Sequence, residues 1–353
     1  MSVLETIYLH IGLEKTGTKT LQTALAVNRQ LLLQHGFIFP RAPGPYTHLG
    51  LAIYAANEGA VPDLRKYVGL FEQERYLAFL EAHPAELARE LGGSACQTAI
   101  FSNEHCSSRL SSVTEIAKLR RLLRPLARQC SVIVYLRRQD DLAVSRYSTF
   151  VQSGATAEFC FPSGVPWFDY LRLLDMWAEV FGRDNLVIRI FEPAQMKGGD
   201  LLADFFSIIG FAGYGQLQRP ADQNRSLDVH TLEFLRRFNA HVPVFTDNAV
   251  NLDRGDVAEA LAGIAAREPL RPSPEAATAF MIQFAQSNAE VARKYLHRPD
   301  DALFSSEPRG DRRPRTATLD AGKAVEIAAA LWRWQQGRIR QLQSKDEGGS
   351  ASD

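Results

Sequence analysis

Residues 6–20 read Thr-Ile-Tyr-Leu-His-Ile-Gly-Leu-Glu-Lys-Thr-Gly-Thr-Lys-Thr. The first six of these are mostly apolar or β-branched and end at Gly12, which is typical of a buried strand. Beyond the loop, leucines recur at helical spacing from Leu21 to about Gln34. This stretch therefore predicts a strand, a glycine-containing loop and a helix, in that order.

The alternation of strands and helices continues through the first 210 residues. Further strands are expected at 98–102, 131–136 and 186–190, and helices at 72–91, 113–128, 140–151, 167–181 and 200–209. Residues 36–66 contain several prolines and are expected to be irregular. This order of elements predicts an α/β fold, a mostly parallel sheet of the P-loop type with helices on both faces.

The rest of the chain shows only helical patterns, which lie at 227–240, 254–266, 274–297 and 318–342. We expect a single domain over residues 1–343, with a sheet core at about 1–212 and a helical portion at about 225–343. Residues 344–353 are rich in glycine, serine and aspartate, so this end is expected to form a flexible tail.

The composition limits the classes of function. Lys plus Arg and Asp plus Glu both number 40, so the formal net charge is zero, and no nucleic-acid partner is expected. The four cysteines form no CxxC pair and have no zinc-ligand spacing, which predicts reduced thiols and no metal site. Because neither a signal peptide nor an apolar run of about 20 residues is visible, we expect a soluble, cytoplasmic protein.

The loop at 12–17 has the features of an anion site. A glycine-containing loop between a strand and a helix directs backbone N–H groups at one point, where the helix dipole adds about half a positive charge. Gly12 and Gly17 have the spacing of the nucleoside-triphosphate motif GxxxxGK[ST], but Thr18 replaces its lysine. No expected strand ends in an aspartate for Mg²⁺. We therefore expect the loop to bind an anion other than magnesium-bound ATP.

Two segments resemble the motifs of sulfotransferases that use 3′-phosphoadenosine 5′-phosphosulfate (PAPS). Residues 10–22 are similar to the 5′-phosphosulfate loop with its KTGTT core, although Lys19 stands where the family usually has threonine or serine. Residues 132–145, Val-Ile-Val-Tyr-Leu-Arg-Arg-Gln-Asp-Asp-Leu-Ala-Val-Ser, resemble the 3′-phosphate motif. Weaker matches resemble bacterial carbohydrate sulfotransferase-like proteins and lie at 177–182, 204–210, 224–227 and 288–295.

The resemblance implies a role for each matching residue. The residues expected to hold the donor are Lys15, Thr16, Gly17, Thr18, Lys19, Thr20, Arg137 and Ser145. Among them, Lys15 would donate to the oxygen that bridges phosphate and sulfate, where charge develops on the leaving group. Arg137 at the end of a strand and Ser145 eight residues later would bind the 3′-phosphate.

Sulfuryl transfer also needs a base that takes the proton of the acceptor. Glu104 follows the expected strand at 98–102, at the edge where open α/β sheets gather their ligands. The resemblance suggests a glutamate or a histidine as the base. Glu104 is therefore the first candidate, and His48 and His105 are the alternatives.

These observations together predict a PAPS-dependent sulfotransferase that acts on a hydroxyl or amine without a metal. The carbohydrate-like motifs favour a glycan, a glycolipid or a small glycoside as the acceptor. Two other functions stay open at this point. One is a P-loop nucleotide or small-molecule kinase, and the other is a non-catalytic protein that binds 3′-phosphoadenosine nucleotides.

Overall fold

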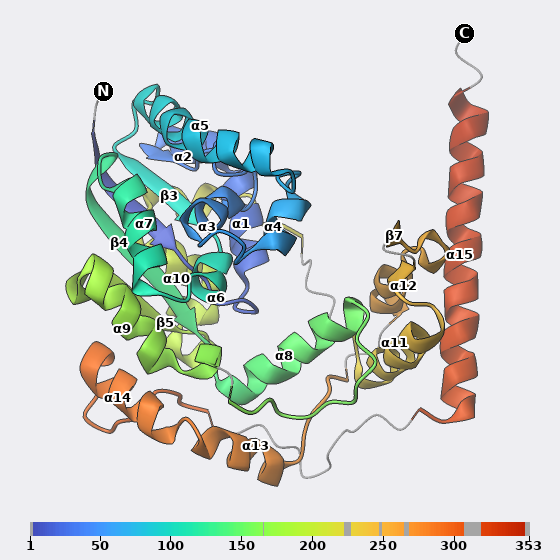
Figure 1. Ribbon diagram of the computed structural model, residues 1–353. Helices are drawn as coiled ribbons and strands as arrows, with labels where there is room; N and C mark the ends of the chain where they lie inside the picture. Colours follow the sequence, from blue (N-terminus) through green and yellow to red (C-terminus); the bar gives the residue numbers. More distant parts are fainter. Residues whose placement is uncertain are drawn as a thin grey trace. The chain divides into compact units, whose positions relative to one another are not determined.

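The computed structural model describes residues 3–164, 166–221, 227–246, 249–264, 268–306 and 319–349 (Figure 1). The chain forms two compact units. The first unit consists of Met1–Gln139, Gly164–Gln223 and Gln283–Glu307. The second unit consists of Asp140–Ser163, Asn224–Ile282 and Pro308–Asp353.

A five-stranded parallel sheet forms the centre of the first unit, with the strand order β2-β3-β1-β4-β5. The strands are β1 (Leu4–His10), β2 (Phe37–Ile38), β3 (Thr98–Ser102), β4 (Ala127–Leu136) and β5 (Leu186–Ile190). His10 at the end of β1 pairs with Ser102 of β3 and Ile133 of β4. Since the strands are parallel, the segments that follow β1, β3 and β4 meet at one edge of the sheet.

One face of the sheet is covered by α1 (Thr18–Val27), α2 (Arg29–Gln34) and α10 (Leu201–Ile208). Leu21 and Leu25 of α1 are fully buried against Ile133 and Tyr135 of β4. The Tyr135 hydroxyl donates to the buried Asp204 carboxylate at 2.9 Å. This polar contact lies inside the apolar layer and fixes α10 on the sheet.

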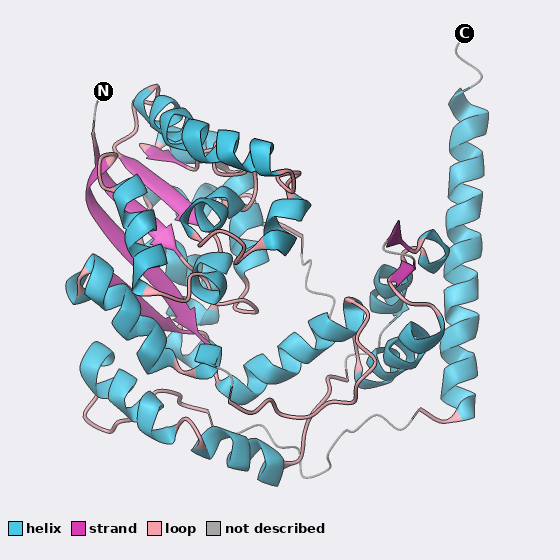
Figure 2. Cartoon of the chain, viewed as in Figure 1, coloured by secondary structure: helices cyan, strands magenta, loops and turns pink. Residues whose placement is uncertain are grey.

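Helices cover the other face as well (Figures 1 and 2). The covering helices include α3 (Leu49–Ala55), α7 (Val113–Leu123) and α9 (Tyr170–Phe181), which contact one another or the strands. Further α-helices of this unit are α4 (Pro62–Tyr67), α5 (Gln73–Gly92), α6 (His105–Arg109) and α14 (Ala285–Leu296). The segment Val132–Leu136 of β4 is fully buried and consists of aliphatic residues and one tyrosine, because both faces of the sheet are covered.

The second unit is mainly helical. Its elements include α8 (Gln139–Gln152), α11 (Val229–His241), α12 (Val257–Ile264), α13 (Pro274–Ile282), α15 (Ala321–Gly349) and the strands β6 (Phe245–Thr246) and β7 (Ala249–Val250). The first residue of α8, Gln139, belongs to the first unit. The core of the second unit joins Val151, Leu235, Leu261 and Ile327.

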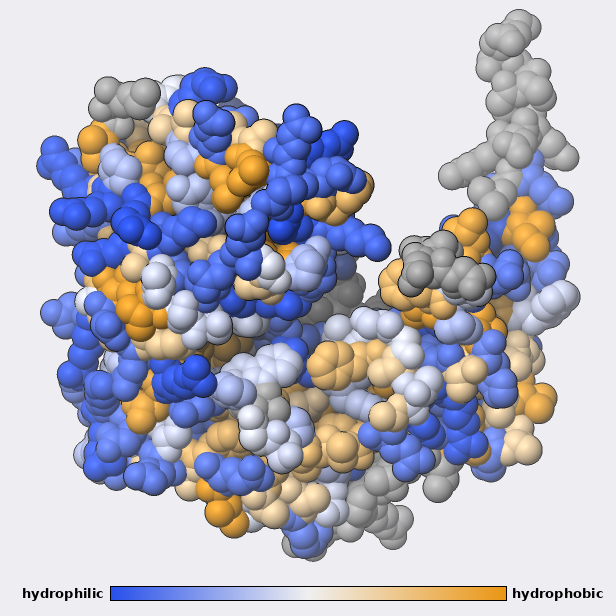
Figure 3. All heavy atoms as spheres, viewed as in Figure 1, coloured by the Kyte–Doolittle hydropathy of each residue, from blue (hydrophilic) through white to orange (hydrophobic). Residues whose placement is uncertain are grey.

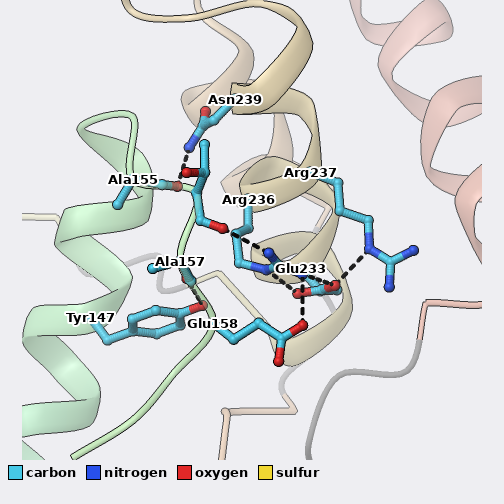
Figure 4. A network of polar contacts seen from close by, with 9 residues as sticks. Tyr147, Ala155, Ala157, Glu158, Glu233, Arg236, Arg237 and Asn239 are labelled. Atoms are coloured by element: carbon cyan, nitrogen blue, oxygen red, sulfur yellow. Dashed lines mark hydrogen bonds and ion pairs between the residues drawn. The ribbon is translucent and has the colours of Figure 1, made fainter.

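A polar network ties the end of α8 and the segment that follows it to α11 (Figure 4). The Asn239 side-chain amide donates to the Val151 and Ala155 carbonyls, both at 2.8 Å. Arg236 pairs with Glu233 and donates to the carbonyl of Thr156, each at 2.7 Å. These bonds hold the backbone of residues 151–156 against α11.

The structure confirms the predicted fold class and corrects several local expectations. Residues 36–66 were expected to be irregular, but they contain β2, α3 and α4, because Pro62 at a helix start is compatible with a helix. The helix expected at 113–128 ends at Leu123, since β4 begins at Ala127. The helix expected at 274–297 is two helices, α13 and α14. The helical region also contains the two-residue strands β6 and β7.

The expected domain boundaries stay predictions. Helix α15 continues to Gly349, and residues 350–353 lie outside the described part of the chain. No helix among the described residues is both long and apolar enough to cross a membrane. On the face seen in Figure 3, apolar side chains form small patches among hydrophilic ones.

Candidate anion-binding site

The loop between β1 and α1 has three residues with left-handed backbone angles, namely Gly12 (φ 72°), Lys15 (φ 67°) and Gly17 (φ 76°). Thr16 closes the loop by donating its hydroxyl to the Leu13 carbonyl at 2.7 Å. A left-handed angle at a residue with a side chain, such as Lys15, costs about 1–2 kcal/mol. Such strain persists only where the surrounding contacts impose it, and it is concentrated at functional sites.

The loop leads directly into the amino-terminal end of α1. Gly17 is the N-cap residue, and no side chain in the described part of the chain caps this helix. The first N–H groups of a helix have no acceptor within the helix, and the helix dipole is positive at this end. The first turn also lacks acidic residues. The loop and helix start therefore offer backbone donors to an anion.

Gly12 lies against Glu104. A Cβ atom placed on Gly12 would be 2.7 Å from both the Cα and the Cβ of Glu104, so the absence of a side chain allows this approach. The Glu104 carboxylate accepts a bond of 2.7 Å from the Gln22 amide of α1. Glu104 is half-buried and precedes α6. The carboxylate is thus held beside the loop by a residue of the helix that the loop starts.

Arg137 follows β4 and reaches the same loop. Its Nη1 donates to the Lys15 carbonyl at 2.7 Å, and the Arg137 carbonyl accepts a bond from the Tyr170 hydroxyl. The guanidinium carbon lies 5.9 Å from the centre of the Phe191 ring. Phe191 also lies close to the position that a Cβ of Gly17 would take, at 3.5 Å. The structure therefore brings Arg137 and the loop together around one aromatic ring.

The other predicted donor-binding residues differ in exposure. Thr16 and Thr18 are buried, Thr20 is half-buried and Lys19 is exposed. Ser145 is half-buried in α8 of the second unit, where its carbonyl accepts a bond from Thr149. The donor-binding roles of these residues stay predictions.

The histidine alternatives to Glu104 lie in different surroundings. His48 is fully buried, and its Nδ1 accepts the Ser102 backbone N–H at 3.0 Å while its Nε2 donates to the Pro40 carbonyl at 2.9 Å. Burial lowers the pKa of His48 to about 3. Both ring nitrogens of His48 are therefore hydrogen-bonded to backbone groups. His105 is half-buried, and its Nδ1 lies 3.8 Å from the Glu14 carboxylate.

The sequence interpretation did not single out Gln22, Tyr170 or Phe191 as parts of this site. Gln22 lies within the loop motif, four residues after Thr18, and could have been noticed as one helical turn from the loop. Tyr170 and Phe191 belong to distant segments, and their contacts with Arg137 depend on the tertiary fold.

No family model matches the chain. An uncharacterized protein of the archaeon Archaeoglobus fulgidus is 27% identical over 203 residues, which are 56% of this chain and 54% of that protein. The match thus spans about half the length of this relative. A crystal structure of a sulfotransferase from Alicyclobacillus acidocaldarius is similar with a TM-score of 0.40 and 13% identity, over 84% of this chain and 97% of that chain.

Proposed function

We propose that the chain transfers a sulfuryl group from PAPS to a hydroxyl or amine, most simply one on a carbohydrate or glycolipid. The observation that carries this proposal is the 2.7 Å bond between Arg137 and the Lys15 carbonyl. These residues are 122 positions apart and match the two halves of the PAPS-binding pattern. Their contact supports one site for a donor that carries two separate anionic groups.

In this proposal the loop holds the reactive end of the donor. The backbone N–H groups at the start of α1 and the hydroxyls of Thr18 and Thr20 bind the 5′-phosphosulfate, as anions bind at helix N-termini. Arg137 binds the 3′-phosphate, since a planar guanidinium can give two parallel bonds to phosphate. Ser145 is proposed as a second donor to the same phosphate.

The proposed reaction is a displacement at sulfur. The acceptor oxygen or nitrogen forms a bond to sulfur while the bond from sulfur to the bridging phosphate oxygen breaks. The electron pair of that bond leaves with 3′-phosphoadenosine 5′-phosphate. Lys15 stabilises the negative charge that develops on the bridging oxygen, and a donor of this kind contributes about 3 kcal/mol.

Glu104 is the proposed base that accepts the acceptor proton. It is half-buried beside the loop, and its carboxylate is oriented by Gln22 at 2.7 Å. His48 is the poorer choice, because both of its ring nitrogens are used by backbone groups in the fully buried interior. The geometry therefore favours Glu104 over His48.

Replacement of Lys15 tests the proposed function. Lys15→Ala should lower kcat for sulfuryl transfer from labelled PAPS by about 10²–10³-fold, while the Kd for 3′-phosphoadenosine 5′-phosphate should change by less than about tenfold. Lys66→Ala removes an equal charge from an exposed position in α4 and serves as the control.

Three outcomes would contradict the proposal. Unchanged turnover in Lys15→Ala would remove this residue from the mechanism. Nucleotide binding without consumption of PAPS, across a panel of sugar acceptors, would indicate a binding protein. Consumption of ATP that depends on magnesium would indicate a kinase.

A further inference from the structure

A cavity of about 520 Å³ lies in the first unit, away from the loop at 12–17. Val3 and Leu126 line it, and these residues directly precede β1 and β4. The loop at 12–17 follows the opposite end of β1. A strand of the length of β1 spans about 23 Å, so the cavity and the loop lie at opposite edges of the sheet.

Most of the cavity wall is apolar. Ala88 and Leu91 of α5 face it, as do Leu122 of α7 and Pro125 of the turn that leads to β4. Leu91 and Leu122 are 3% and 6% exposed, so they belong to the core that supports the wall. The cavity volume lies within the range of about 300–1,000 Å³ that is usual for small-molecule sites.

Two cations of α7, Lys118 and Arg121, also line the cavity. Among the described residues, neither has a carboxylate partner within ion-pair distance. The nearby Glu115 carboxylate is already used, since it accepts the backbone N–H groups of Asn57 and Ser111 at 2.8 and 2.9 Å.

The Lys118 side chain is half-buried, whereas Arg121 is exposed to solvent. The Lys118 ammonium lies 5.1 Å from the centre of the Tyr54 ring, which is part of the wall. Burial and then the charge of Arg121 lower the pKa of Lys118. An anion in the cavity would offset the repulsion between the two cations, because an opposite charge near both of them favours their charged forms.

We propose that this cavity binds an amphipathic anion, a small molecule with an alkyl or aryl body and one carboxylate or sulfate head. The head group lies between Lys118 and Arg121, and the body contacts Ala88, Leu91 and Leu122. Each buried methylene contributes through the hydrophobic effect, and each charged hydrogen bond adds specificity for the anion. This binding site is independent of the proposed sulfuryl transfer.

Calorimetric titration of the full chain with three eight-carbon probes tests the proposal. Octanoate, octan-1-ol and octylamine share the body and differ in the charge of the head. Octanoate should bind about tenfold tighter than octan-1-ol, because charged hydrogen bonds contribute more than 1.4 kcal/mol, and octylamine should bind most weakly. Equal affinities for octanoate and octan-1-ol would overturn the proposal.

A matched pair of variants distinguishes binding of octanoate in the cavity from a general attraction to the positive charge of α7. Arg121→Gln should weaken octanoate about tenfold and leave octan-1-ol within about twofold. Arg120→Gln makes the same change at the preceding residue, which lines a different pocket, and should change octanoate affinity by less than about twofold. Equal losses in the two variants would contradict a specific site.

Ala88→Trp tests the role of the apolar wall of the cavity. Ala88 is half-buried on α5, so a tryptophan there should fill the cavity and abolish binding of octanoate and octan-1-ol, with an unfolding temperature close to that of the wild type. Octanoate binding that survives in this variant would overturn the proposal. Binding to phosphatidylglycerol vesicles that is lost in Arg121→Gln but kept in Ala88→Trp would assign the cations to a membrane surface instead.

Discussion

Gly12→Ala tests the close packing between the loop and Glu104. The left-handed angle at Gly12 (φ 72°) costs about 1–2 kcal/mol for alanine. The new Cβ would also meet the Glu104 Cα and Cβ at 2.7 Å, and overpacking of this kind costs about 1–3 kcal/mol. We expect the free energy of unfolding of the first unit to fall by about 2–5 kcal/mol in total.

Gly36→Ala is the matched control, because Gly36 has a similar angle (φ 81°) but no atom within 4 Å of a Cβ placed there. This variant should lose only the backbone contribution of about 1–2 kcal/mol. Urea unfolding, followed by a probe in the first unit, measures the free energy of unfolding of both variants. In addition, Gly12→Ala should weaken binding of 3′-phosphoadenosine 5′-phosphate, whereas Gly36→Ala should not. Equal destabilisation by the two substitutions would refute the proposed contact with Glu104.

Two further substitutions test the proposed base Glu104 and the ion pair between the buried Asp204 carboxylate and the half-buried Arg189 guanidinium, whose charged atoms lie 2.5 Å apart. Glu104→Gln should lower kcat by at least about 10²-fold with nucleotide affinity kept, and loss of that affinity would assign Glu104 a structural role instead. Asp204→Asn should cost about 3 kcal/mol at pH 7, against less than about 1 kcal/mol for Asp63→Asn in an exposed pair. Burial alone would raise the pKa of Asp204, but hydrogen bonds from Arg189 and Tyr135 among others lower it below its ordinary value. The ionised Asp204 carboxylate therefore stabilises the fold at neutral pH, and this stabilisation is lost as the pH falls through the folded pKa. The urea midpoints of Asp204→Asn and wild type should converge in acid. A gap between the midpoints that does not change with pH would contradict this.

Much of the fold could be predicted from the sequence because local patterns determine it. The apolar runs at 98–102 and 186–190 form β3 and β5 with the expected bounds. The region at 36–66 could not be predicted in the same way. Its prolines suggested breaks, but Leu49–Ala55 forms a buried helix whose stability depends on packing against neighbouring helices.

The parts of the candidate site that lie within a contiguous sequence motif could be predicted. The loop at 12–17 and Arg137 are found from the residue pattern, and the parallel sheet brings them to one edge. The bonding of His48 could not be read from the sequence, because its partners Ser102 and Pro40 depend on the tertiary fold. For the same reason, the sequence left the choice among Glu104, His48 and His105 open.

The central claim is that Arg137 recognises a 3′-phosphate next to the anion loop. The most direct test compares binding of 3′-phosphoadenosine 5′-phosphate and adenosine 5′-monophosphate, which differ only in that phosphate, to wild type and Arg137→Ala. A disturbance of the loop by the substitution would weaken binding of both nucleotides. The ratio of the two Kd values therefore reports only the contact between Arg137 and the 3′-phosphate. Wild type should prefer the bisphosphate by about 10–100-fold, and Arg137→Ala should lose most of this preference. Equal affinities in wild type, or an unchanged ratio in the variant, would contradict the account.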